Sequence, residues 1–373
     1  MIASLHSPLA TELAARYPAT HPVGDWVRAH LSPFGAFTVN ALLALALTTV
    51  FVSLTALFLV WMERKVCARF QLRLGPNRVG PFGLLQTLAD GAKLFLKESF
   101  MPREADFFVY HLAPLIPITS SFMVFCVLPF DHHIQIADPQ GGLIYLAAFL
   151  GMGVFGVLLA GWASNNKYSL LGGMRSGAQM IAYEISYVLC LLLIVLASGS
   201  ASTRDIVLAQ HGTVLNWWLF KLPGCGALGF LIFLISSTAE LHRAPFDIAE
   251  AESELTGGFH TEYSGMGFSM FFLSEYSNLF VAAGLGTTLF LGGFLAPQFG
   301  LGPLDRALDL VPGFAWFLLK VYGLIYLYMW LRWTFPRLRV DQLMALEWKF
   351  LLPLALGNLA IAAVLVTLGW LLP

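Results

Sequence analysis

The run Val39–Met62 reads VNALLALALTTVFVSLTALFLVWM and contains no charged side chain. A helix needs about 20 mainly apolar residues to cross the hydrocarbon core of a bilayer. Seven further apolar runs follow, at residues 109–129, 143–163, 179–198, 226–239, 270–295, 314–333 and 350–372. We therefore predict an all-α polytopic membrane protein with about eight transmembrane helices. The fifth run is short, so we expect it to extend upstream or to tilt.

The composition agrees with this class. Hydrophobic residues make up 58% of the chain, charged residues 12%, and the mean hydropathy is +0.73. These values exclude an ordinary soluble domain and predict contact with a lipid bilayer. The net charge of −1 gives no reason to expect a nucleic-acid partner. The four cysteines are scattered, without a C-x-x-C pair or a histidine at ligand spacing, so we predict no metal site, zinc or iron–sulfur cluster in this chain.

The basic residues predict the orientation of the helices. Fifteen lysines and arginines fall on the side that holds the connections from odd-numbered to even-numbered runs, and five fall on the opposite side. Positive charge is retained in the cytoplasm, so both termini are expected on the periplasmic side. Residues 1–38, where prolines interrupt any apolar core, are predicted to be an external extension and not a signal peptide. Residues 39–373 are predicted to form the transmembrane domain.

The basic segment after the first run is expected to lie on the cytoplasmic side. The first helix should continue to about Leu74, and the string Gly75-Pro-Asn-Arg-Val-Gly-Pro81 should end it. Residues 82–98 then have an apolar face typical of an amphipathic helix. Such a helix either lies on anionic lipid or forms a half-submerged wall beside which an amphiphilic ligand enters sideways.

Acidic residues mark the expected site of chemistry. The stretch 239–275 holds seven acids between two apolar runs: Glu240, Asp247, Glu250, Glu252, Glu254, Glu262 and Glu275. Glu184 and Glu275 lie inside apolar runs, where an ionisable group usually marks an ion or proton path. The alternative for each is a structural carboxylate bonded to a neighbouring serine or tyrosine. If residues 247–254 are helical, Glu250 and Glu254 share a face and Glu252 points away.

Several other residues are harder to interpret from the sequence. Arg243 and Asp247 are a possible ion pair, although Pro245 between them disturbs regular geometry. Lys320 lies inside an apolar run, where it either extends to the surface or pairs with an acid. The string Gly151-Met-Gly153-Val-Phe-Gly156 has the spacing of a dinucleotide-binding loop, but no strand precedes it, so we predict close helix packing. The arginines at 332, 337 and 339 are predicted anchors, with a docking surface as the alternative.

Three long strings resemble one family, the H subunit of bacterial NADH–quinone oxidoreductase (respiratory complex I), equivalent to mitochondrial NADH dehydrogenase subunit 1. The first comprises Glu63-Arg-Lys, Gln71-x-Arg73-x-Gly-Pro-Asn-Arg-Val-Gly-Pro-Phe-Gly-Leu-Leu-Gln and Ala89-Asp-x-x-Lys93-Leu-Phe-x-Lys-Glu98. The second comprises Ala239-Glu-x-x-Arg-Ala-Pro-Phe-Asp-x-x-Glu-Ala-Glu-Ser-Glu-Leu255, Gly258-x-x-Thr-Glu-Tyr263 and Ser274-Glu-Tyr276. The third is Arg332-x-x-x-Pro-Arg-x-Arg-x-Asp-Gln-Leu343. The chain departs from the pattern at Leu241-His242, where the family usually has Thr-Asn.

The resemblance implies a membrane subunit that forms much of a quinone chamber and couples quinone reduction to proton translocation in the bacterial inner membrane. It implies proton-coupling roles for Glu184, Glu240, Glu250, Glu252, Glu262 and Glu275. It places Glu63, Arg64, Arg73 and Asp90 near the quinone tunnel. The implied partners are soluble quinone-site and iron–sulfur subunits on the cytoplasmic side, with small membrane subunits and antiporter-like subunits. Quinone is then the substrate, and the chain is not catalytic in isolation.

Two alternatives use other partners or none. Membrane-bound hydrogenases and related ferredoxin- or F420-linked complexes contain a homologous membrane protein, but the near-complete string at residues 75–81 argues against them. A stand-alone secondary transporter would favour paired repeats with broken helices at the midplane, and no such repeat is visible in the sequence.

Overall fold

A computed structural model describes residues 33–248, 257–300 and 302–369. Within these ranges the chain is helical and forms no strand, which confirms the predicted all-α class. The long helices are α3 (Pro33–Phe70), α7 (Gly142–Ala163), α8 (Lys167–Ser198), α11 (Cys225–Glu240), α13 (Gly265–Phe290), α15 (Gly313–Thr334) and α17 (Leu352–Thr367). The shorter ones are α4 (Leu85–Leu96), α5 (Phe107–Leu112), α6 (Leu115–Phe125), α9 (Thr203–Leu208), α10 (Trp218–Lys221), α14 (Gly302–Leu308) and α16 (Val340–Leu346).

The described residues contain 6 helical segments long and apolar enough to cross a membrane, so the chain is a multi-pass membrane protein. The predicted number was about eight. Two predicted transmembrane helices are not among the six. Helix α11 is only 16 residues long and extends upstream no further than Cys225, and the central residues of α13 are polar. Nearly all of α13 from Leu279 to Phe290 is buried by neighbouring helices, so this helix needs no lipid-compatible surface. The external extension stays a prediction, because residues 1–32 lie outside the described ranges.

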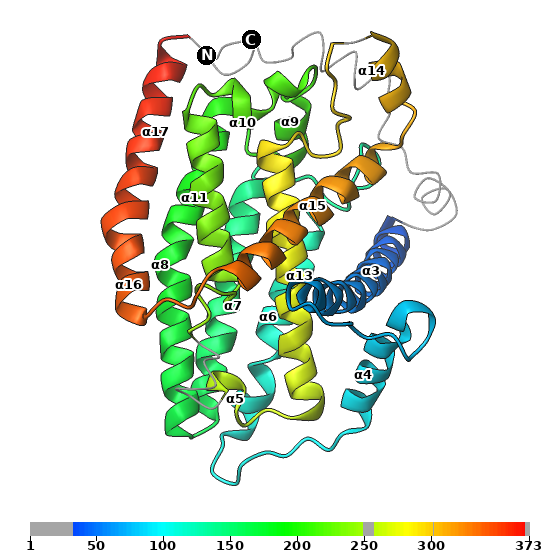
Figure 1. The fold of residues 1–373 in the computed structure, drawn as a ribbon, viewed down its shortest axis with the longest axis vertical. Coiled ribbons are helices and arrows are strands. Elements are labelled where there is room, and N and C mark those ends of the chain that lie inside the picture. Colours follow the sequence, from blue (N-terminus) through cyan, green and yellow to red (C-terminus); the bar gives the residue numbers. More distant parts are fainter. Residues whose placement is uncertain (1–32, 249–256, 301, 370–373) are drawn as a thin grey trace.

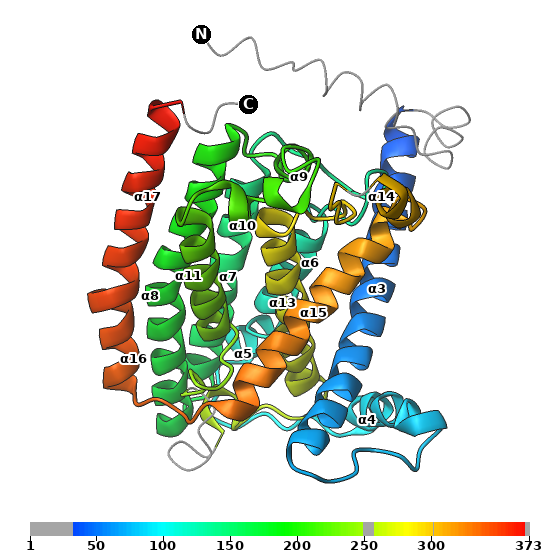
Figure 2. The ribbon, with the colours of Figure 1, turned by 45° about the horizontal axis from the view of Figure 1, so that its top comes forward.

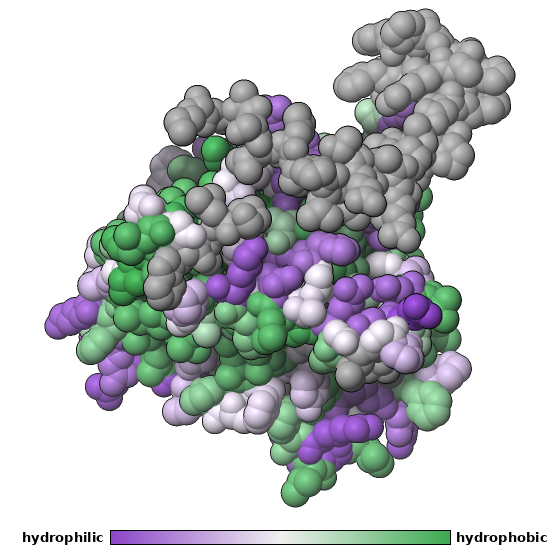
Figure 3. Space-filling view, turned by 90° about the horizontal axis from the view of Figure 1, so that it is seen from above, coloured by the Kyte–Doolittle hydropathy of each residue, from purple (hydrophilic) through white to green (hydrophobic). Residues whose placement is uncertain are grey.

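The helices run between two ends of the molecule (Figure 1). Helices α4 and α5 lie at one end, and α9, α10 and α14 lie at the other. Figure 2 shows the connection from α15 to α16 at the first end. Helix α3 begins and α17 ends at this second end, while α15 crosses the bundle obliquely (Figure 2). Seen from the second end, hydrophilic patches lie among hydrophobic ones (Figure 3). The first end is the one that the basic residues predict to be cytoplasmic.

Glycines allow three helices to approach closely, as predicted for residues 151–156. A Cβ atom added at Gly151 would lie 2.4 Å from Glu184 Oε1 on α8. One added at Gly156 would lie 2.4 Å from Pro117 on α6. Gly156 therefore excludes a larger side chain, whereas one at Gly151 would have to displace the end of Glu184; such close approach is usual where transmembrane helices touch.

Lys320 takes neither of its two predicted roles. Its Nζ donates hydrogen bonds to the backbone oxygens of Leu291, Gly293 and Leu295, at 2.7, 3.0 and 2.7 Å. It also lies 4.3 Å from the centroid of the Trp217 ring. These carbonyls follow the end of α13, where a cation is favoured by the unpaired oxygens and the helix dipole.

Candidate functional site

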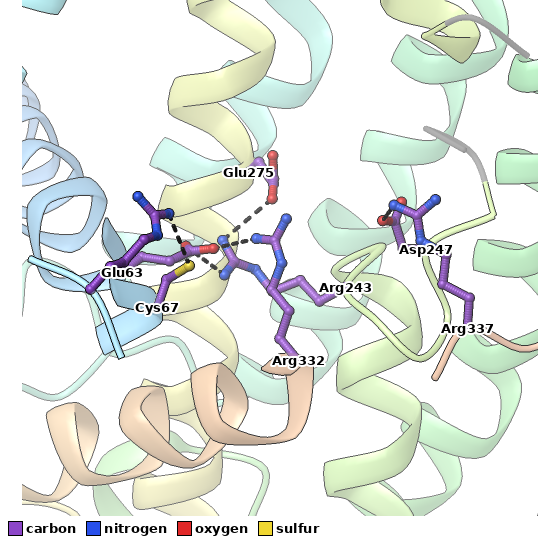
Figure 4. A network of polar contacts seen from close by, with 8 residues as sticks. Glu63, Cys67, Arg243, Asp247, Glu275, Arg332 and Arg337 are labelled. Atoms are coloured by element: carbon purple, nitrogen blue, oxygen red, sulfur yellow. Dashed lines mark hydrogen bonds and ion pairs between the residues drawn. The ribbon is translucent and has the colours of Figure 1, made fainter. Parts of the chain in front are cut away.

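A buried arginine connects two of the predicted site residues. Arg243 follows α11 and is 1% exposed. Its Nη1 donates to Glu63 Oε2 on α3 at 2.8 Å, and its Nη2 donates to Glu275 Oε1 on α13 at 3.3 Å (Figure 4). Arg332 Nη1 on α15 donates to the other oxygen of Glu63. We call these four residues the charge network. It joins α3, α13, α15 and the loop after α11.

The network holds equal numbers of acids and bases. A buried guanidinium is tolerated only when it is paired and hydrogen-bonded, because desolvation of an isolated charge is very costly. Burial opposes the charge of Arg243, but Glu63 and Glu275 outweigh it and raise the pKa of Arg243 above its ordinary value. The Tyr276 ring, with its centroid 5.1 Å from the guanidinium carbon, adds a cation–π contact. Arg243 is therefore a permanent positive charge between two carboxylates.

The other residues predicted for the quinone tunnel lie around the end of α3. Arg64 Nη1 donates to Asp90 Oδ2 at 2.5 Å, which fixes α4 to α3. Arg73, just beyond α3, donates to Gln71 Oε1 at 2.6 Å, and its Nη2 lies 3.9 Å from Cys67 Sγ. Glu63 and Cys67 are one helical turn apart on α3. The structure thus brings the four predicted residues to one region, but only Glu63 joins the charge network.

A ligand-sized cavity of about 540 Å³ lies beside this region, between α3, α15 and the turn that precedes α4. Its lining is mostly apolar and consists of Trp61, Met62, Lys65, Val66, Arg69, Phe70, Phe82, Leu84 and Tyr326. Pockets for small molecules are typically about 300–1,000 Å³ and mainly apolar. Met62, which lines the cavity, precedes Glu63 in the chain. Glu63 does not itself line the cavity, so the cavity and the charge network occupy neighbouring positions of α3.

A second cavity lies at the opposite edge of the network. It is about 50 Å³, and its polar lining residues include Glu240, His242, His260 and Glu275. This volume holds a few water molecules and no larger ligand. Glu275 therefore takes part both in the charge network and in a polar cavity that it shares with Glu240.

The remaining predicted acids are arranged less closely. Glu184 on α8 packs against Gly151 of α7, and its carboxyl group is near enough to that of Glu240 for electrostatic interaction. Glu262 accepts a hydrogen bond from Asn166 Nδ2 at 2.6 Å and does not line the small cavity. Glu250, Glu252 and Glu254 lie outside the described residues. The structure thus groups Glu184, Glu240 and Glu275, and sets Glu262 apart.

The comparisons with known proteins agree on one family. A family model described as NADH dehydrogenase matches residues 43–363. The chain belongs to this family, whose members include the H subunit of NADH-quinone oxidoreductase.

Three relatives, each named as the H subunit of NADH-quinone oxidoreductase, are similar along most of their length. The relative from Bacteroides thetaiotaomicron is 46% identical over 319 residues, which cover 85% of this chain and 88% of the relative. The relative from Phocaeicola vulgatus is 46% identical over 349 residues, 92% and 97% of the two chains. The relative from Brevibacillus brevis is 48% identical over 331 residues, 89% and 93%. The chain is thus a subunit of the NADH-quinone oxidoreductase type, an enzyme complex.

Sequence reasoning missed the two arginines that hold this oxidoreductase site together. Arg243 was matched with Asp247, but the structure pairs it with Glu63 and Glu275, and Asp247 Oδ2 accepts from Arg337 at 2.7 Å. Arg332, predicted as an anchor, reaches Glu63 instead. One signal was available for Arg243. It is the single lysine or arginine in residues 239–275, which hold seven acids.

Leu241 and His242, where the sequence departs from the string expected by resemblance, lie next to the site. Leu241 is buried in the apolar core, and His242 has a φ of 51° with its Nε2 2.5 Å from Ser176 Oγ on α8. Histidine is among the few residues besides glycine that tolerate this left-handed conformation. The turn therefore directs an imidazole into the small cavity.

No group of three or more histidine, cysteine, aspartate or glutamate side chains within residues 33–248, 257–300 and 302–369 could hold a metal ion.

Gly151→Ala tests the position of Glu184. The added methyl group would overlap Glu184 Oε1, a flexible chain end that can move away, so we expect assembly to be preserved and the carboxyl group to be displaced. We expect quinone-reductase turnover about fivefold lower, equivalent to ~1 kcal/mol in the barrier. Gly153→Ala is the matched control, because nothing lies within 4 Å of its added Cβ. Equal turnover in both variants would contradict a role for the Glu184 position.

Proposed function

We propose that this chain forms much of the quinone chamber of a bacterial NADH-quinone oxidoreductase and couples quinone reduction to proton translocation. The observation that carries the proposal is the position of Arg243. It joins Glu63, next to the ligand-sized cavity, to Glu275, which lines the water-sized cavity. A change of charge at the first cavity therefore acts on Glu63 through space, and Arg243 carries the effect to Glu275 by direct contact.

The volume of the ligand-sized cavity suits the head group and the first hydrophobic tail segments of a quinone. Its wall is apolar, with Lys65 and Arg69 among the lining residues. The apolar side chains of α4, including Leu88 and Phe95, are exposed in this chain, as expected for a helix that meets lipid or a partner subunit. Arg64, Arg73 and Asp90 lie at the same end of α3 and are proposed tunnel residues. Electrons would come from an iron–sulfur cluster in an adjacent soluble subunit.

The charge network supplies the coupling step. Reduction of a quinone by two electrons creates negative charge that takes up two protons. Negative charge beside Glu63 destabilises the ionised form of that carboxyl group and weakens its ion pair with Arg243. The guanidinium therefore shifts toward Glu275. Carboxylates that interact titrate as a set, so the change at Glu275 alters Glu240 and Glu184. Moving one charge across a membrane requires about 2.3 kcal/mol per 100 mV, which is an amount of energy that interactions between neighbouring charges can supply.

The same proposal gives an orientation and partners. The end of the molecule that holds α4 and the loop with Arg243 would face the cytoplasm, where the soluble quinone-site and iron–sulfur subunits would dock. Small membrane subunits and antiporter-like subunits would receive the signal from Glu184, Glu240, Glu262, Glu250 and Glu252. The transmembrane domain would lie in the bacterial inner membrane with both termini in the periplasm.

Val66→Phe tests whether the large cavity binds quinone. The larger ring fills part of the cavity, so we expect the KM for quinone to rise about tenfold, equal to ~1.4 kcal/mol, with kcat preserved at saturation. Steady-state kinetics of the intact complex in membranes measure both constants. Leu354→Phe, on the exposed side of α17, is the matched control and should leave both unchanged. An unchanged KM in a normally assembled Val66→Phe complex would place quinone elsewhere.

A further inference from the structure

A carboxyl group that none of the quoted sequence strings includes lies buried between α8 and α17. Glu347 is in a π-helical turn, Glu347–Leu351, that links α16 to α17, and it is 1% exposed. Ser186 Oγ on α8 donates to Glu347 Oε1. Glu347 Oε2 is buried and has no hydrogen-bond partner among the described residues. A buried carboxyl oxygen without a partner is costly, and π-helical turns are frequent at functional sites.

A row of polar side chains on α8 leads from Glu347 back to the small cavity. Ser176, Gln179, Tyr183 and Ser186 recur at intervals of three and four residues, so they share one face of the helix. At one end of this row Ser186 contacts Glu347, and at the other Ser176 contacts His242. The row spans about 15 Å at 1.5 Å per residue.

Glu240 lies beside the same row. Gln179 Nε2 donates to the backbone oxygens of Ala239 and Phe246 at 2.7 and 2.8 Å. Ala239 precedes Glu240, the last residue of α11 and a lining residue of the small cavity. The row therefore starts next to a proposed coupling acid and ends at Glu347.

We call the interface between this row and α11 the seam. Two further buried oxygens in it, Gln179 Oε1 and Ser236 Oγ, lack a hydrogen-bond partner among the described residues. Ser236 is seven residues, or two helical turns, after Gly229 on α11, where an added Cβ would lie 2.5 Å from the Leu193 side chain of α8. Ser236 therefore points toward α8 as well. Ordered water usually satisfies buried polar groups of this kind, so we expect water molecules beside each of these oxygens along the interface between α8 and α11.

We propose that Glu347 is a further proton-accepting residue of the coupling machinery, reached from Glu240 through a hydrated seam between α8 and α11. The Glu347 carboxylate takes one proton on Oε2 from a seam water, and that water is reprotonated from the Glu240 end past Gln179 and Ser236. The proton returns by the same route when Glu240 is again ionised. This inference rests on the proposed function, because it extends the same chain of carboxyl groups.

Glu347→Gln in the intact complex is the first test. Glutamine keeps an acceptor for Ser186 but cannot bind a transferable proton. We therefore expect normal assembly and about tenfold fewer protons translocated per quinone reduced. Infrared difference spectra on quinone reduction should lose one protonated-carboxyl band. Unchanged proton translocation, or an unchanged set of carboxyl bands, would overturn the proposal.

Ser236→Ala is the second test, and it does not depend on the folding of the Glu347 variant. Its hydroxyl has no partner to lose among the described residues, so a purely structural seam predicts no effect, whereas the proton route predicts slower translocation. Ser164→Ala, at a buried serine after α7, is the matched control and should be silent. Normal translocation in Ser236→Ala would also overturn the proposal. Glu275→Gln, assayed in parallel, distinguishes failure of the Glu347 proposal from failure of the proposed function, because normal pumping in that variant contradicts the proposed function itself.

Discussion

Arg243→Lys is expected to lower quinone reduction about a hundredfold, equal to ~2.7 kcal/mol in the barrier, in a complex that still assembles. Lysine keeps the positive charge, so no carboxylate loses all compensation. It lacks the planar fork that lets one guanidinium bind Glu63 with Nη1 and Glu275 with Nη2. The single ammonium nitrogen of a shorter side chain cannot keep both contacts in the geometry that the two guanidinium nitrogens hold. The connection between the two cavities is then broken without removing a charge.

The measurement is the NADH–quinone reductase rate per assembled complex in membranes, with proton translocation measured beside it. Arg337→Lys is the matched control, because the Arg337–Asp247 pair is half-exposed at the arginine and lies outside the charge network. Lysine keeps the charge at the solvent-accessible end of this pair, so this variant should behave almost as wild type. Near-normal turnover in Arg243→Lys would show that the guanidinium bridge between Glu63 and Glu275 is not needed.

Glu63→Gln is expected to have the largest effect on stability. Glu63 accepts from both Arg243 and Arg332, so its neutralisation leaves two guanidinium groups facing one carboxylate. Removal of one partner from a buried ion pair costs about 3–5 kcal/mol. We expect a lower unfolding temperature of the purified complex, less assembled enzyme in the membrane, and slower but measurable quinone reduction in the part that assembles.

Thermal unfolding of the detergent-solubilised complex and blue-native electrophoresis measure these two effects. Glu104→Gln is the control, because Glu104 is exposed and accepts one long hydrogen bond, 3.4 Å from Asn165. That variant should match wild type in both assays. A Glu63→Gln complex as stable as wild type would mean that Glu63 is already protonated and that the charge network is weaker than the geometry indicates.

The helices were predictable from the sequence where lipid dictates the pattern. Runs such as Val39–Met62 and residues 143–163 appear as α3 and α7 because each must present an apolar surface. Helix α13 shows the limit of this reasoning. Its Glu275, Ser277 and Asn278 make it too polar by hydropathy, yet it occupies the centre of the bundle, where neighbouring helices replace lipid. Composition alone cannot distinguish these two environments.

The site was predictable one residue at a time, but its connections were not. Glu63, Glu240 and Glu275 stand out because acids are rare next to apolar runs. That Glu63 and Glu275, 212 positions apart, share Arg243 follows from the packing of α3 against α13, which no local pattern encodes. Glu347 was overlooked for a similar reason. In the sequence it precedes the last apolar run, whereas in the fold the helix begins at Val340 and carries it into the bundle.

The most direct test of the account is a double-mutant cycle on Glu63→Gln and Glu275→Gln, with the quinone-reductase rate normalised to assembled complex. If both residues act through Arg243, the double variant should be within about twofold of the slower single variant, because the second change removes a connection already broken. If the double variant instead loses the product of the two single effects, Glu63 and Glu275 act independently. The proposed link between the quinone cavity and the coupling acids would then be wrong.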